Sequence, residues 1–218
     1  GVTMNIQKNL DTIKPFIKDQ IIVAATKYVE VDEIKALYAC GIENVGENRV
    51  QDFLRKYDLL IDYPLKWHFI GHLQTNKVKM MINKIDYLHS LDSLKLASSI
   101  QKERNSILPC FIEVLLTDEP NKTGILPSEV LDFVQSLQQY DIISVVGLMG
   151  MAKANGSEAE VRKSFNQLRE LRNDIAKLYL PYAPCQWLSM GMSDDYQIAI
   201  ECEATHLRLG SILFRNEE

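Results

Sequence analysis

A lysine at the end of the first apolar run is the residue with the clearest chemical potential. The run, residues 21–25, is rich in β-branched side chains and predicts a buried strand, and Thr26 and Lys27 follow it. Barrels and open α/β sheets carry their chemistry at this end of the strands. Burial there would disfavour the ammonium of a group whose ordinary pKa is ~10.4, so that Lys27 could form an imine. Taken alone, however, such a lysine is more often a solvated surface residue.

Two turns rich in glycine and serine lie near the other end of the chain. They are Leu188-Ser189-Met190-Gly191-Met192-Ser193 and Arg208-Leu209-Gly210-Ser211. In barrels, the loops after the seventh and eighth strands often hold phosphate, and glycine backbone, serine hydroxyls and helix N–H groups suit a dianion. The alternative is that Ser193 or Asp194 caps a helix expected over residues 194–201. An imine-forming lysine and a phosphate cradle together indicate a phosphorylated aldehyde, with pyridoxal phosphate as the leading candidate.

Three further polar residues could complete such a site. Arg208 and Gly210 share one side of their strand, and an inward arginine needs a partner, either a ligand acceptor or a carboxylate within the barrel. Asn48 ends the second strand and could donate to a ligand oxygen, although it could also cap the next helix. His68 alternates with Phe69 and could point into the barrel. A lone histidine there is usually a hydrogen-bonded core residue, but His68 stays among the candidates for cofactor binding.

The elements that must position these residues alternate along the whole chain. Strand-like runs begin near Ile21, Ile42, Leu65, Ile85, Leu108, Ile142, Cys185 and Thr205. Helical patterns cover residues 31–40, 47–60, 92–105, 128–139 and 157–180, and another helix over residues 5–18 precedes the first strand. The pattern predicts an α/β fold, a single (β/α)8 TIM barrel domain over residues 1–218. A doubly wound open sheet is the alternative, but no Gly-x-Gly-x-x-Gly turn follows the first strand.

The composition excludes several classes of function. The chain has 218 residues, is 46% hydrophobic and carries a net charge of −5, which suits one sizeable core and argues against nucleic acid or a membrane surface as partner. Its four cysteines are scattered without metal-binding spacing, so we expect reduced thiols, no metal site and a cytoplasmic protein. We see no signal peptide and no membrane-spanning stretch. No large apolar stripe demands a dimer, so a monomer is expected.

Several motifs recur in the order found in one known family. They are Thr26-Lys27, Gly46-Glu47-Asn48, Trp67-His68-Phe69-Ile70-Gly71, Leu73-Gln74-Thr75-Asn76-Lys77, Gly147-Leu148-Met149, Leu188-Ser189-Met190-Gly191-Met192-Ser193-Asp194-Asp195 and Arg208-Leu209-Gly210-Ser211. With these motifs, which span essentially the whole chain, the sequence resembles the YggS/PROSC family of pyridoxal phosphate homeostasis proteins. The resemblance implies a barrel like the N-terminal domain of alanine racemase, the fold type III group of pyridoxal phosphate proteins.

The resemblance also implies roles for individual residues. It implies a Schiff base on Lys27, Arg208 facing the pyridine nitrogen, Asn48 beside the ring, and a phosphate held by Ser189, Met190, Gly210 and Ser211. It further implies a cytoplasmic carrier or buffer of the cofactor with no established reaction and no catalytic residues. Apo forms of pyridoxal phosphate enzymes are then candidate partners.

Two other functions stay open at this point. Arg208 cannot share a proton, so the pyridine nitrogen should stay unprotonated, which weakens the ring as an electron sink. A weak amino-acid racemase would need a base from within the barrel, such as His68 or Tyr28, because the chain has no length left for the second domain that racemases use. An imine-forming aldolase that acts on a phosphorylated sugar, without a cofactor, is the third hypothesis.

Overall fold

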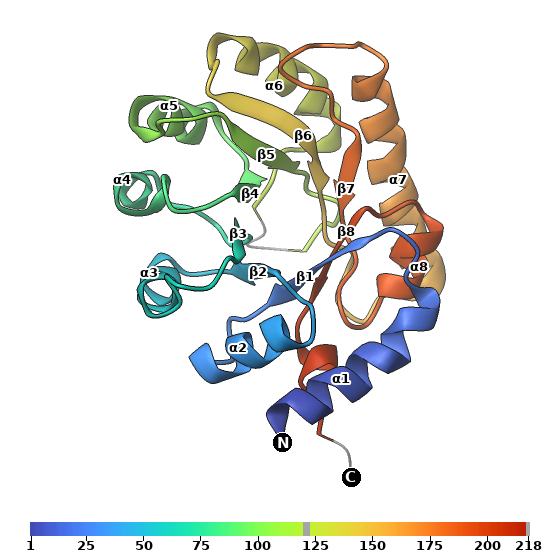
Figure 1. Cartoon of the computed structure of the whole chain (residues 1–218). Coiled ribbons are helices and arrows are strands. Elements are labelled where there is room, and N and C mark those ends of the chain that lie inside the picture. Colours follow the sequence, from blue (N-terminus) through green and yellow to red (C-terminus); the bar gives the residue numbers. More distant parts are fainter. Residues whose placement is uncertain (120–122, 217–218) are drawn as a thin grey trace.

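The apolar runs of the sequence form eight parallel strands that close into a barrel in chain order. The computed structural model describes residues 1–119 and 123–216. The strands are β1 (Ile21–Ala25), β2 (Asn44–Glu47), β3 (Lys66–Phe69), β4 (Tyr87–Leu91), β5 (Leu108–Glu113), β6 (Ile143–Met149), β7 (Trp187–Ser189) and β8 (His206–Leu209). The first strand pairs with both the second and the last, which closes the ring seen in Figure 1. This confirms the predicted TIM barrel.

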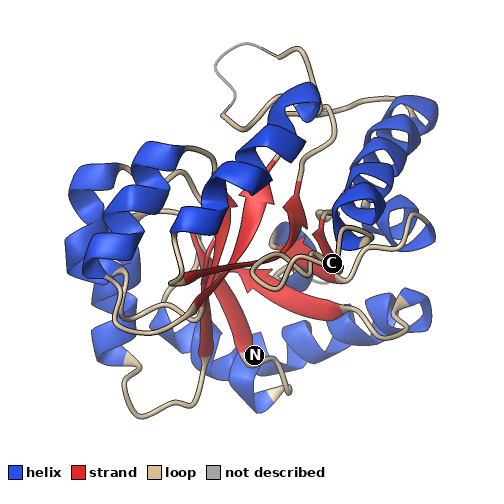
Figure 2. Ribbon diagram, turned by 90° about the horizontal axis from the view of Figure 1, so that it is seen from above, coloured by secondary structure: helices blue, strands red, loops and turns tan. Residues whose placement is uncertain are grey.

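The helices lie outside the ring, as Figures 1 and 2 show. They are α1 (Val2–Ile13), α2 (Val31–Ala39), α3 (Val50–Leu59), α4 (Val78–Met81), α5 (Leu94–Glu103), α6 (Val130–Ser136), α7 (Glu158–Ala176) and α8 (Tyr196–Glu201). Side-chain caps fix where two of them start: Ser93 accepts from the N–H of Leu96, and Ser157 forms a capping box with Glu160. These caps determine the direction from which each helix packs onto the barrel.

The predicted and observed elements differ mainly at the ends of helices. The first helix ends at Ile13 rather than at residue 18, because Pro15 begins a 3₁₀ turn, η1 (Lys14–Phe16), directly after it. The helix predicted from residue 47 begins at Val50, because residues 44–47 belong to β2. The sequence patterns did not locate α4, which has only one turn.

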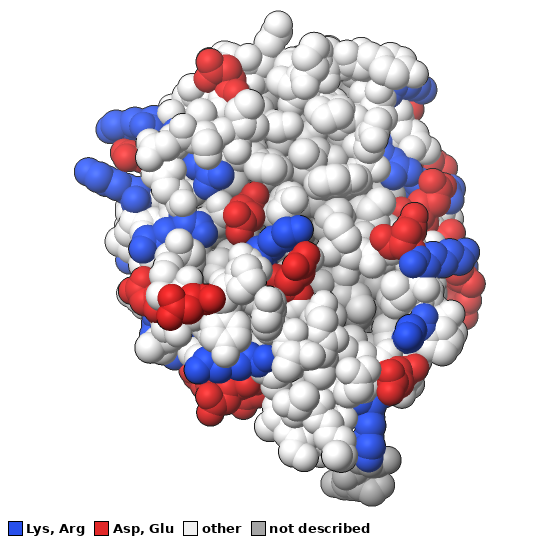
Figure 3. Space-filling view, viewed as in Figure 1, with Lys and Arg blue, Asp and Glu red and all other residues white. Residues whose placement is uncertain are grey.

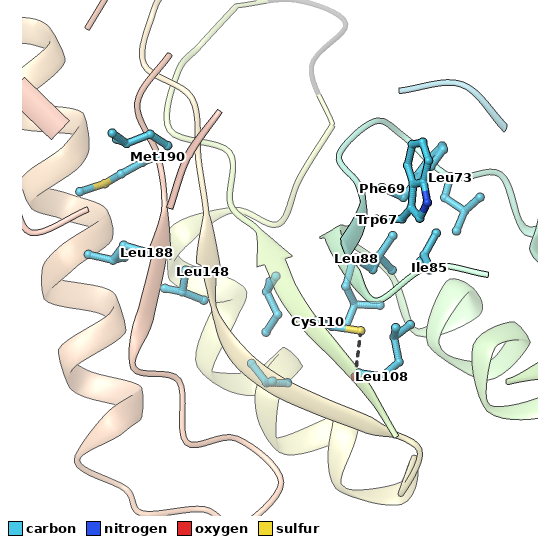
Figure 4. Close-up of a cluster of buried hydrophobic side chains, with 14 of the residues drawn as sticks. Trp67, Phe69, Leu73, Ile85, Leu88, Leu108, Cys110, Leu148, Leu188 and Met190 are labelled. Atoms are coloured by element: carbon cyan, nitrogen blue, oxygen red, sulfur yellow. Dashed lines mark hydrogen bonds between the residues drawn. The ribbon is translucent and has the colours of Figure 1, made fainter. Parts of the chain in front are cut away.

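Two layers of side chains form the core. One lies between the strands and the helices and is apolar; Figure 4 shows part of it, with Trp67, Leu88 and Leu148 among its labelled residues. The other fills the barrel and is rich in aromatic rings, namely His68, Tyr87, His89, Phe111, Trp187 and His206, which contact one another. Valine, isoleucine and leucine dominate most barrel interiors, so this polar interior needs hydrogen-bond partners of its own.

Helix α1 is tied to the end of the chain. The side-chain amide of Asn9 donates to the carbonyls of Leu213 and Arg215, at 2.9 Å each. Because Leu213 lies in the 3₁₀ turn η5 (Ser211–Leu213) after β8, α1 supports the last loop of the barrel.

The surface charges, the cysteines and the helices show what kinds of site the described residues contain. On the face shown in Figure 3, acidic and basic side chains are interspersed. The four cysteines are free thiols. Among residues 1–119 and 123–216, no group of histidine, cysteine, aspartate and glutamate is arranged to hold a metal ion. None of the described helices has the length and apolar character that crossing a bilayer requires.

Candidate functional site

Strand register brings the predicted residues of β1, β2 and β8 to one mouth of the barrel. Val23 pairs with Arg208, and Ala25 pairs with Gly46. Because side chains alternate along a strand, Lys27, Asn48 and Gly210 continue the inward-facing rows of these three strands. A methyl group placed on Gly210 would lie 3.5 Å from Ala25, so the loop after β8 touches the end of β1.

Lys27 is exposed rather than buried, which corrects the expectation of a desolvated lysine. Thr26 is the last buried residue of this segment, and the turn at residues 27–28 then leaves the barrel wall. The ammonium of Lys27 lies 4.9 Å from the ring centroid of Tyr28, which is itself 89% exposed. The amine is therefore accessible to a small molecule that enters from solvent.

A buried ion pair fixes the backbone directly before Lys27. Lys56 is 1% exposed and Glu47 is fully buried, and their charged atoms Nζ and Oε2 lie 2.9 Å apart. The same Nζ donates to the carbonyl of Thr26 at 2.8 Å, and the Thr26 hydroxyl donates to Glu47. Burial raises the pKa of Glu47, while the bonds from Thr26 and Lys56 act in the opposite direction. The ion pair thus fixes the peptide group between Thr26 and Lys27.

The loops after β7 and β8 lie together and present free backbone donors. The hydroxyl of Ser193 accepts from the N–H of Ile212 at 3.2 Å, and the N–H of Arg208 donates to the carbonyl of Gly191 at 2.9 Å. The backbone N–H groups of Ser193, Gly210 and Ser211 find no acceptor among the described residues. Donors of this kind suit an anion such as phosphate.

Ser193 belongs to the phosphate-type turn indicated by the sequence, and capping of α8 is its alternative role. In the structure Asp195 occupies the cap position, and its carboxylate accepts from the N–H of Met192 at 2.7 Å. Met190, which the resemblance assigns to the phosphate, is fully buried, and its N–H donates to the carbonyl of His206 at 3.2 Å. The second serine of the motif, rather than Met190, therefore offers a polar group to the cradle.

Arg208 is a buried cation without an anionic partner. It is 4% exposed, and it donates from Nη1 to the Ser189 hydroxyl at 2.7 Å and from Nη2 to the carbonyl of Gly150 at 3.3 Å. Burial lowers its pKa to about 10. Among the described residues no carboxylate lies within 4.0 Å of it, and its three other N–H groups have no acceptor. The alternative for Arg208, a salt bridge to a carboxylate within the barrel, is therefore not found among the described residues.

Ser189 and His68, for which contact with a cofactor is predicted, both make hydrogen bonds within the protein. Ser189 bonds to Arg208 and, at 2.8 Å, to Nδ1 of His89. His68 uses both ring nitrogens, with Nδ1 at 2.8 Å from Nε2 of His89 and Nε2 at 2.8 Å from Oδ1 of Asn44. Burial is the main reason why the pKa of His68 falls to about 3 and that of His89 falls well below its usual range. Both rings are therefore neutral.

Asn48 lacks a hydrogen-bond partner. Its Oδ1 is buried, and no described residue donates to it. Buried polar atoms are rarely left unpaired in native proteins, so a donor from outside the protein is expected here. With the exposed amine of Lys27, the free N–H groups and the uncompensated guanidinium of Arg208, this atom completes a site that fits a phosphorylated aldehyde.

The sequence matches one family and several of its characterised members. The family described as "Alanine racemase, N-terminal domain" matches residues 3–217. A protein of Aquifex aeolicus named pyridoxal phosphate homeostasis protein is 41% identical over 196 residues, which cover 88% of this chain and 85% of that protein. A protein of the same name from Pasteurella multocida is 33% identical over 97% of each chain.

Solved structures show the same fold. PipY of Synechococcus elongatus PCC7942 with pyridoxal phosphate bound superimposes with a TM-score of 0.86 at 28% identity, and covers 96% of this chain and 100% of PipY. Alanine racemase from Corynebacterium glutamicum gives a TM-score of 0.78 at 14% identity, over 99% of this chain and 61% of the racemase. The second likeness concerns the fold alone.

Proposed function

The chain belongs to the alanine racemase N-terminal-domain family and, within it, to the pyridoxal phosphate homeostasis proteins, and we propose that it binds pyridoxal phosphate as an intracellular carrier or buffer. The observation that carries this proposal is Arg208, a buried guanidinium with three N–H groups that have no acceptor among the described residues. The free backbone donors of Gly210 and Ser211 follow it two and three residues later. A ring nitrogen beside a phosphate is a ligand that satisfies both.

Each group of the site has a part in holding this cofactor. Ser193, Gly210 and Ser211 would bind the phosphate, Arg208 would donate to the ring nitrogen, and the amide of Asn48 would lie by the ring. When bound, the cofactor supplies an electrophilic aldehyde and an electron-withdrawing ring. Lys27 supplies the amine that becomes covalently joined to the aldehyde carbon, and Thr26, Glu47 and Lys56 hold the peptide from which it extends. We propose that this one barrel domain is sufficient for binding.

We infer a carrier rather than an enzyme because His68, the base inside the barrel that the racemase hypothesis would use, is committed to hydrogen bonds within the protein. His68 and His89 have both ring nitrogens bonded to protein, so neither can take up a substrate proton. Arg208 does not give up its proton and would keep the ring nitrogen unprotonated. Cytoplasmic apo enzymes that need pyridoxal phosphate are the recipients that such a carrier would serve. Tyr28, exposed beside Lys27, is the residue that a weak racemase would use as its base.

Titration with pyridoxal phosphate tests the proposal. The protein should turn yellow with one equivalent, and reduction with borohydride followed by peptide mapping should find the cofactor on Lys27. Lys27→Ala should lose the covalent link and keep weaker, non-covalent binding. Lys66→Ala is the control, because Lys66 is half exposed at the opposite end of β3. A colourless protein without an adduct would refute the proposal, and racemisation of amino acids that depends on Lys27 would replace it with the enzyme.

A further inference from the structure

We infer that Asn44, His68, His89 and Ser189 form a positioning chain that holds the Arg208 guanidinium toward the ring nitrogen of the cofactor, without touching the cofactor themselves. The inference rests on the proposed function and assigns a role to residues that lie below the binding site. Four hydrogen bonds of 2.7–2.8 Å link the five side chains from β2 to β8.

The donors and acceptors of this chain admit one direction. Oδ1 of Asn44 can only accept, so Nε2 of His68 donates to it, and Nδ1 of His68 then accepts from Nε2 of His89. Nδ1 of His89 must accept in turn, so the hydroxyl of Ser189 donates to it. The hydroxyl oxygen is left to accept from Arg208. The amide of Asn44 therefore determines, through His68 and His89, that the hydroxyl hydrogen of Ser189 points to His89.

The hydroxyl hydrogen of Ser189 is committed by this direction. Because it points to His89, it cannot also be donated to a phosphate, and the oxygen presents a lone pair to Nη1 of Arg208. The carbonyl of Gly150 holds Nη2. The guanidinium is thus held at two of its three nitrogens, which restricts its orientation.

Aromatic packing prevents the two imidazoles from turning. The ring of His68 stacks on Tyr87 with centroids 4.5 Å apart and planes 11° apart. The ring of His89 stacks on Phe111 at 4.3 Å and 22°. A side chain that is both hydrogen-bonded at each nitrogen and stacked on one face is well suited to set the position of its neighbour.

Stability alone does not account for a polar chain in this place. Barrel interiors are normally filled with valine, isoleucine and leucine, and replacing a buried polar group by an apolar side chain of similar volume is often neutral or stabilising. The positioning chain ends on Arg208, a buried arginine two residues before Gly210, and precise orientation in that place would matter for a ligand.

Two ligands and four variants test the inference. The ligands are pyridoxal phosphate and its benzene analogue, a phosphorylated salicylaldehyde that has the same aldehyde and phosphate but no ring nitrogen. In His89→Leu, we expect the dissociation constant for pyridoxal phosphate to rise about tenfold, since Ser189 loses the partner that orients it, and that for the analogue to change by less than about twofold. His89→Asn places an amide oxygen near the position of Nδ1 and should restore most of the affinity.

The control is His206→Leu. His206 lies in the same aromatic layer, but its Nδ1 bonds to the hydroxyl of Thr205. Its ring makes no hydrogen bond to Asn44, His68, His89 or Ser189. Equal loss for both ligands in His89→Leu, or the same selective loss in His206→Leu, would overturn the inference and leave the chain a packing role. If His89→Leu does not fold, Ser189→Ala with the same two ligands decides, because it leaves both stacked histidines in place. A wild-type protein that binds neither ligand would refute the proposed function instead.

Discussion

Lys56 and Glu47 form an ion pair from which the fold excludes water almost completely. Removing one member of such a pair leaves the other charge buried alone, which costs about 3–5 kcal/mol, whereas replacing both is often nearly neutral. Lys56→Met should therefore lower the free energy of unfolding by that amount at pH 7, and the double variant Lys56→Met/Glu47→Gln should regain most of it. Urea unfolding measures both.

The pH dependence of this variant has a definite sign. Burial already raises the pKa of Glu47, and the loss of Lys56 raises it further, so the folded variant takes up a proton more readily than the unfolded chain does. Protonation relieves the buried charge, and the deficit relative to wild type should shrink as the pH falls from 7 toward 5. A deficit that stays constant over this range would contradict the assignment of the loss to the Glu47 charge.

Ser193 should recognise the phosphate of the cofactor. In Ser193→Ala the hydroxyl beside the Ile212 N–H is lost, and we expect affinity for pyridoxal phosphate to fall about tenfold, with little change for pyridoxal, which has no phosphate. Fluorescence titration with the two ligands measures the difference. Ser136→Ala, on the outer helix α6, is the control. A similar loss for both ligands would indicate a general disturbance of the loop.

For single residues, the sequence could predict which ones lie at the mouth of the barrel, but it could not predict their hydrogen-bond partners. Lys27, Asn48, Arg208 and Gly210 follow from strand ends and alternation. The predicted contacts of Ser189 and His68 with a cofactor rest on motif and alternation, which do not reveal their bonds to His89, because those bonds depend on the register of strands far apart in the sequence. A spacing pattern along one segment contains no information about such contacts.

The loop from β7 to α8 depends on one glycine. Gly191 has φ of +101°, and a methyl group there would lie 2.6 Å from Cβ of Ala199 and 2.9 Å from Leu207. Gly191→Ala should therefore destabilise the fold by more than the ~1 kcal/mol expected for the backbone alone, and it should weaken cofactor binding by displacing the loop. Thermal unfolding and titration with pyridoxal phosphate measure the two effects.

Gly41→Ala is the matched control, because Gly41 has φ of +91° with nothing within 4 Å of the added methyl group. It should show the backbone cost without any change in affinity. If the two variants behave alike, the crowding against Ala199 and Leu207 does not matter, and the loop is more adaptable than its contacts imply.

Most elements could be predicted from the sequence because a parallel barrel buries both faces of its strands. Continuous apolar runs marked all eight strand starts to within two residues, as at Leu108 and Ile143. The patterns failed where an element is too short to repeat, as in α4, and at the end of β2, where Glu47 was included in the following helix. Both failures concern segments that tertiary packing, rather than periodicity, holds in place.

The molecule as a whole should lose stability in mild acid because its interior holds neutral histidines. Burial lowers the pKa of His68 to about 3 and that of His206 to about 4, and that of His89 falls as well. The unfolded chain protonates these rings near pH 6.5, and the folded chain does not. Their contribution is therefore complete above pH 6.5 and is lost on acidification, at up to about 1.4 kcal/mol per pH unit for each ring.

A comparison of variants isolates this effect from the buried carboxyl groups. In His206→Leu the free energy of unfolding should fall less steeply below pH 6.5. The slope should be smaller by up to about 1.4 kcal/mol per pH unit, the contribution of one buried histidine. Urea unfolding at several pH values gives both slopes, and equal slopes in wild type and His206→Leu would contradict the prediction.

The pairing of β1 with β8 joins the first and last strands of the chain, and the site lies across that join. A ligand attached to Lys27 and held by Gly210 and Ser211 would cross-link the two ends of the barrel. Amide hydrogen exchange in these two strands should then slow together on binding, in proportion to ligand concentration over its dissociation constant, and more than in the pair β4–β5. When such a carrier releases the cofactor, it also loses the cross-link that stabilises the pairing of its first and last strands.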